Sequence, residues 1–193
     1  MKKVLLTIVA LLLLAGVVLV ALAASKPNTY RVERKAVVAA PPESAFARVE
    51  DFHRWAEWSP WERLDPAMKK TFDGPERGVG ASYAWSGNAQ VGEGKMMITE
   101  SEPPSRLGQR LEFIKPFAAE CKTQFTFAPD PGGTEVTWVM EGTNNFIAKV
   151  FAVFMNMDTM IGKDLETGLA NLDTAARSNA PPPAAADSTT TTP

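Results

Sequence analysis

The hydrophobic pattern begins with an uncharged, almost wholly aliphatic run from Val4 to Ala24, preceded by two lysines. A helix rises about 1.5 Å per residue, so a helical run of this length reaches roughly 31 Å and can cross the hydrocarbon core of a bilayer. We therefore predict that residues 1–25 form a transmembrane anchor or a signal peptide.

The residues at the two ends of this run help to distinguish a transmembrane anchor from a signal peptide. Lys2 and Lys3 favour an N-terminus in the cytoplasm, with the rest of the chain on the outer, periplasmic side of the cytoplasmic membrane. The sequence Ala21-Leu22-Ala23 resembles a signal-peptidase site, and cleavage there would release a secreted protein. Because the apolar run is longer than a usual signal-peptide core, we favour the uncleaved single-pass anchor.

The middle of the chain, residues 27–178, begins with patterns of strands. Tyr30 to Ala39 alternates between charged and apolar residues, which predicts a half-buried strand, and Glu43 to Asp51 predicts a short helix. Further short segments with apolar residues at every second position follow, and they predict an antiparallel meander. These segments are Met68–Phe72, Gly80–Ser86, Gly92–Glu100, Arg106–Ile114, Glu120–Ala128 and a last strand carrying Val136, Trp138 and Met140.

The period then changes. From Ile147 to Leu172 apolar residues recur every three or four positions, which predicts one long amphipathic helix. Its charged residues, Asp164 among them, are expected largely on the opposite side. Residues 179–193 contain no apolar side chain larger than alanine or proline, so we expect a disordered tail there.

Two segments carry a resemblance to a known superfamily. Val38 to Phe46, followed by Asp51 to Trp61, resembles the opening of the SRPBCC (START/Bet v 1-like) superfamily, nearest to its polyketide cyclase/dehydrase and lipid-transport branch. Met157 to Leu172 is similar to the C-terminal helix of its membrane-anchored bacterial members. The resemblance implies an α+β helix-grip fold, in which a curved antiparallel sheet wraps around a long C-terminal helix and leaves a cavity between them.

Composition removes several function classes. The net charge is −2 and no basic block is present, so nucleic acid is not an expected partner. The single histidine, His53, and the single cysteine, Cys121, cannot supply the usual three or four ligands of a zinc site. We expect no metal and no cofactor, and we interpret Cys121 as a buried, inert thiol.

The candidate binding residues are large apolar side chains. Three of the five tryptophans fall within Trp55–Trp61, and such a cluster builds either one end of a core or the wall of a cavity. Aromatic and methionine side chains around a cavity of the implied fold would suit an apolar ligand, with ordinary core packing as the alternative at each position. The predicted lining residues are Trp58, Trp61, Tyr83, Trp85, Met97, Phe113, Phe125, Trp138, Met140, Phe154 and Met157.

These observations favour a membrane-anchored, non-catalytic module that binds a small hydrophobic or lipid-like molecule. The alternative is a cyclase/dehydrase-like enzyme acting on a hydrophobic substrate in the same cavity. That enzyme would need an ionisable group inside the cavity, with Glu93, His53 and Tyr83 as candidates. A third possibility is an envelope protein that contacts partners through an exposed apolar patch.

Overall fold

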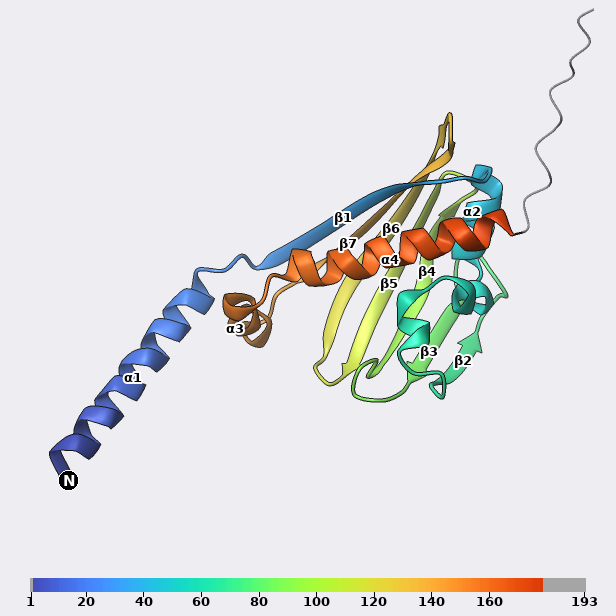
Figure 1. Ribbon diagram of the computed structural model, residues 1–193. Helices are drawn as coiled ribbons and strands as arrows, with labels where there is room; N and C mark the ends of the chain where they lie inside the picture. The colour runs from blue at the N-terminus through green and yellow to red at the C-terminus, as the bar shows by residue number, and fades with distance from the viewer. Residues whose placement is uncertain (1, 179–193) are drawn as a thin grey trace, which may run out of the picture.

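A computed structural model describes residues 2–178, so the predicted tail lies outside the described residues. One seven-stranded antiparallel sheet dominates the domain, with strand order β1-β7-β6-β5-β4-β3-β2. Figure 1 shows this sheet curving behind the long helix α4 (Met157–Arg177), while α1 (Lys2–Ala24) extends away from the domain. The helix-grip α+β fold is confirmed.

The elements follow the predicted order closely. After β1 (Thr29–Val38) come α2 (Pro42–Glu50) and two 3-10 helices, η1 (Phe52–Glu57) and η2 (Pro60–Arg63). The meander contains β2 (Lys69–Asp73), β3 (Ser82–Ser86), β4 (Glu93–Glu102), β5 (Arg106–Lys115), β6 (Ala119–Asp130) and β7 (Gly133–Thr143). Each strand of the meander pairs with the next one, and β1 pairs with β7. The first strand therefore lies beside the last.

The predicted single C-terminal helix is wrong: it is two helices, α3 (Phe146–Phe154) and α4. The backbone is extended at Met155 and Asn156, and the Asn156 side chain accepts a hydrogen bond from the Thr159 N–H at 3.3 Å. Asparagine is a favourable N-cap because its side chain satisfies a free N–H of the first helical turn. The apolar period continues through the break, which is why the pattern alone suggested one helix.

The part of α4 from Leu165 onward closes the core. Leu165, Leu169 and Leu172 are buried there, and Gly168 lies so close to Trp138 that an added Cβ would be 2.6 Å from its ring. The Asn171 amide donates to the Trp58 carbonyl at 3.1 Å, which ties α4 to the end of η1. The N-terminal half of α4 borders a cavity instead.

Candidate functional site

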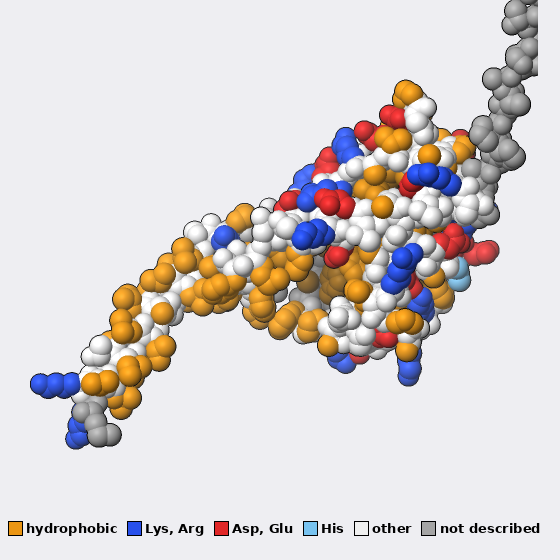
Figure 2. All heavy atoms as spheres, viewed as in Figure 1, with side chains coloured by type: hydrophobic (Ala, Val, Ile, Leu, Met, Phe, Trp, Pro, Cys, Tyr) orange, Lys and Arg blue, Asp and Glu red, His pale blue; other side chains and the backbone are white. Residues whose placement is uncertain are grey.

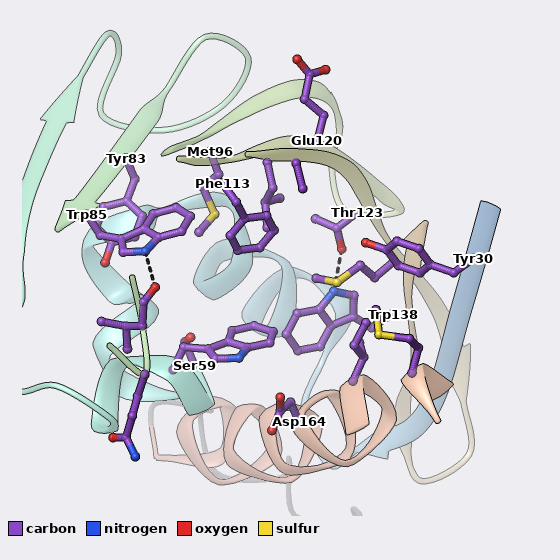
Figure 3. Close-up of a pocket in the computed structure, with 18 of the residues that line it drawn as sticks. Tyr30, Ser59, Tyr83, Trp85, Met96, Phe113, Glu120, Thr123, Trp138 and Asp164 are labelled. Atoms are coloured by element: carbon purple, nitrogen blue, oxygen red, sulfur yellow. Dashed lines mark hydrogen bonds between the residues drawn. The ribbon is translucent and has the colours of Figure 1, made fainter. Parts of the chain in front are cut away.

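A cavity of about 340 Å³ lies between the sheet, the N-terminal half of α4 and the two 3-10 helices. In Figure 3 the aromatic rings stand around this space, with the sheet above and α4 below. Much of its wall is aromatic or methionine side chain. Seven of the predicted residues line it, namely Trp61, Tyr83, Trp85, Phe113, Trp138, Met140 and Met157.

Four predicted residues do not line the cavity. Trp58 and Phe125 are fully buried in the core behind its wall, where the Trp58 ring lies 6.1 Å from that of Phe125. Met97 is 41% exposed because it lies on the outer face of β4. Phe154 is 73% exposed at the end of α3. Strand alternation decides the position of Met97, and the helix break decides that of Phe154.

The structure adds lining residues that sequence reasoning missed. Met96 faces inward on β4, as the alternation with Met97 could have indicated. Tyr30 of β1 and Thr123 of β6 also border the cavity, although they are far apart in the sequence. They meet because β1 pairs with β7, and β7 pairs with β6. No local pattern carries that information.

The indole N–H groups of the wall are already satisfied. Trp85 donates to the Val91 carbonyl at 3.0 Å, and Trp138 donates to the Thr123 hydroxyl at 2.7 Å. The Thr123 hydroxyl in turn donates to the Val139 carbonyl at 2.9 Å. With their donors occupied, these rings are fixed in place and offer apolar surface to the cavity.

One polar cluster lies at the β3 end. The Tyr83 hydroxyl donates to Glu62 Oε1 at 2.7 Å, and Lys70 forms an ion pair with the same carboxylate. Burial raises the pKa of Tyr83, and its hydrogen bond to Glu62 raises it further. Tyr83 therefore stays protonated across the physiological range and acts as a fixed donor.

A second polar group lies on α4. Asp164 points up into the cavity in Figure 3, and burial raises the pKa of its carboxyl, although a hydrogen bond with Trp61 opposes the shift. The expectation that Asp164 lies on the polar side of the helix is wrong. It follows Met157 by seven positions and Ile161 by three, so it shares their face.

The other candidate acid–base residues lie elsewhere. His53 stacks on Phe72 at 4.1 Å between ring centroids and is not part of the cavity lining. Glu93 forms an ion pair with Lys115 at 2.9 Å, which lowers the pKa of Glu93. Cys121 is buried, and this burial raises its pKa to about 11. Within residues 2–178, no three His, Cys, Asp or Glu side chains gather as a metal site would require.

Comparison with known families places this cavity in context. The sequence profile of a family described as polyketide cyclase/dehydrase and lipid transport matches residues 29–177, nearly the whole folded domain. The chain belongs to this family. The match begins at β1 and ends at the last residue of α4, so it excludes the apolar helix α1. No curated protein matches the chain.

Solved structures share the fold of this polyketide cyclase/dehydrase family member. A protein from Chromobacterium violaceum superposes with a TM-score of 0.55 at 20% identity, over 78% of this chain and 98% of that one. The di-domain ARO/CYC BexL of the BE-7585A biosynthetic pathway gives 0.57 at 17% identity, over 83% of this chain and 53% of BexL. Ara h 8.0201 gives 0.51 at 10% identity, over 78% and 96%. At these identities the likeness is one of fold, that of the SRPBCC/Bet v 1 superfamily.

Proposed function

We propose that the domain binds a small hydrophobic or lipid-like molecule in the cavity between α4 and the sheet, without converting it chemically. The observation that carries this proposal is the cavity itself, about 340 Å³ and walled in large part by aromatic and methionine side chains. Small-molecule sites are typically of about 300–1,000 Å³ and mostly apolar. Burial of apolar ligand surface would drive binding.

Polar groups around the cavity would orient an amphipathic ligand. In Figure 3 Tyr83 lies toward one end of the cavity, Asp164 lies on α4, and Tyr30 lies toward the opposite end. Glu62 accepts the hydrogen bond from the Tyr83 hydroxyl. A ligand with one hydroxyl or carbonyl group could hydrogen-bond to one of them while its apolar part contacts the rings. The family description, which includes lipid transport, agrees with such a ligand.

A cavity-filling variant tests the proposal. Ile161 is partly buried on the cavity face of α4, so Ile161→Trp should fill part of the space. Thr167→Trp places the same side chain at an exposed position of α4 and serves as the control. We expect Ile161→Trp to weaken binding of a dansyl-labelled fatty acid about tenfold or more, equivalent to about 1.4 kcal/mol, with Thr167→Trp close to wild type. Equal affinities for all three proteins would refute the cavity as the site.

We also propose that α1 anchors the domain outside the cytoplasmic membrane. Within the described residues, α1 is the one helix long and apolar enough to span a bilayer, and the two lysines at its N-terminal end favour this orientation. The chain should then resist carbonate extraction, keep its full N-terminal mass and be digested by protease added to spheroplasts. A mature chain that begins after Ala23 would instead establish cleavage and secretion.

The cyclase/dehydrase-like alternative is favoured by one observation, the Asp164 carboxyl in an apolar cavity with a raised pKa. Such a carboxyl could exchange a proton with a substrate during loss of water from a β-hydroxy carbonyl compound. An enzyme of this kind should form the unsaturated product, and Asp164→Asn should abolish turnover while leaving binding of the dansyl probe intact. A binding module should give no product above the rate in buffer.

A further inference from the structure

We propose that α3 and the tip of the β5–β6 hairpin form a membrane-contact surface beside the cavity, through which an apolar ligand passes between bilayer and cavity. This membrane surface is defined by Phe117, Ile147, Phe151 and Phe154. The proposal rests on the proposed functions of the cavity and of α1, and it adds where the ligand enters.

The exposure of α3 is the first observation. None of its nine residues is buried, and Ile147, Phe151 and Phe154 are 47%, 48% and 73% exposed. Their spacing of four and three positions places them in one stripe along the helix. Phe117, on the β5–β6 hairpin, is 50% exposed, and its ring lies 6.2 Å from that of Phe151. Exposed aromatic side chains gathered in this way mark an interaction surface.

The position of α3 indicates that the exposed stripe contacts the bilayer. The apolar helix α1 contacts α3, and only the four residues Ser25–Asn28 separate α1 from β1. Four residues span at most about 14 Å, so a membrane-spanning α1 holds the domain against the bilayer surface. This connection is also fixed to the segment before α3, because the Asn144 amide donates to the Pro27 carbonyl at 3.1 Å. The stripe is therefore held where α1 leaves the membrane.

The charge of α3 agrees with this position. Lys149 is the only charged residue in the helix, and its ammonium group bonds the Asn28 side chain in the connection to α1. The cation thus lies on the side of α3 that faces the connection, and the Phe151 and Phe154 side chains are solvent-exposed. An interfacial helix places its apolar face roughly 5–10 Å into the headgroup region with basic residues near the headgroups.

The cavity opens beside the same elements. Ala148 of α3 lines it, together with Asn144 just before α3 and Met157 just after it. The β5–β6 hairpin contributes Phe113 and Ala119. Figure 2 shows a hollow between the orange side chains around α3 and the rest of the domain. A lipid-like molecule could therefore enter the cavity past α3 without crossing bulk water.

The test places an NBD fluorophore on the full chain reconstituted in phosphatidylcholine vesicles containing nitroxide-labelled lipid. Phe154→Cys and Phe117→Cys report on the membrane surface. Val37→Cys is the control, because Val37 is 46% exposed near the far end of β1. Cys121 is buried, and the wild-type chain gives the labelling background. We expect blue-shifted emission and strong nitroxide quenching at both test positions and neither effect at Val37.

Two fluorescence results would overturn the proposal. The first is nitroxide quenching at positions 117 and 154 that is no greater than at position 37. The second is a blue shift without quenching by lipid, which would assign the surface to a second copy of the chain or to another protein. If carbonate releases the chain from membranes, the proposal that α1 is a transmembrane anchor is refuted. Quenching by added vesicles then still tests the membrane surface separately.

A second measurement separates entry from affinity. Phe117→Glu combined with Phe154→Glu should slow uptake of the dansyl-labelled fatty acid from vesicles about tenfold or more, because burial of even one phenylalanine side chain is worth about a factor of ten. Affinity for the probe in detergent should stay unchanged, and Val37→Glu should alter neither quantity. Unchanged uptake by the double variant would overturn the entry route. Failure of the wild-type chain to bind the probe would instead refute the cavity function.

Discussion

Replacement of Thr123 by valine should destabilise the domain through one unsatisfied hydrogen bond. Thr123 and Trp138 are 3% and 1% exposed, and the threonine hydroxyl accepts from the Trp138 indole N–H at 2.7 Å. Valine keeps the shape of threonine but offers no acceptor. Leaving a buried donor without a partner costs about 1–3 kcal/mol. Because a domain of this size changes its melting temperature by about 2–4 °C per kcal/mol, we expect a fall of roughly 2–12 °C.

The assay is thermal unfolding followed by near-ultraviolet circular dichroism, which reports on the packing of the tryptophans, with the full chain in a mild detergent. Thr126→Val is the matched control, since Thr126 belongs to the same strand but alternates to its outer face. We expect that variant to stay within about 0.5 kcal/mol of wild type. A Thr123→Val variant as stable as wild type, or equal losses at both positions, would refute the reasoning.

Three more predictions concern the interior. Gly168→Ala gains about 1 kcal/mol of helix propensity, but its Cβ would be 2.6 Å from the Trp138 ring, and such overpacking costs about 1–3 kcal/mol. We therefore expect a less stable variant that binds the dansyl probe more weakly. A more stable variant with normal affinity would contradict this prediction. The Gln109 side chain is buried, at 1% exposure, and its amide has no hydrogen-bond partner within residues 2–178. In urea unfolding experiments, Gln109→Leu should therefore raise the free energy of unfolding by about 1 kcal/mol or more. A lower free energy of unfolding would instead indicate that a water or ligand binds the amide. The pKa of Asp164 is raised in the folded state, so its favourable contribution to stability is complete below the unfolded-state pKa and is lost as pH rises through the folded-state pKa. Across pH 4–7, the stability of Asp164→Asn should therefore increase relative to that of wild type as pH rises. A constant difference in the free energy of unfolding would be inconsistent with a raised pKa.

Much of the architecture is determined by local sequence patterns. Alternation along each strand places one face toward the core, so residues such as Leu111 and Phe125 are buried as their pattern indicates. Ser59 is extended and separates η1 from η2, because proline disfavours helical geometry at the residue before it. The long apolar run needs no tertiary context to define α1. These features depend on neighbours in the chain, which is why periodicity is enough.

The make-up of the cavity was decided only in three dimensions. Tyr30 reaches it because β1 pairs with β7, while Phe125 and Trp58 lie behind its wall because other rings cover them. Asn156 divides the C-terminal helix by a capping bond that the apolar period does not encode, and this division separates α3 from α4. Local patterns of residues were enough to predict the strands, the apolar helix and the family. Tertiary packing decided which apolar side chains meet one another and which remain free to meet a ligand, because that choice depends on contacts between residues distant in the chain.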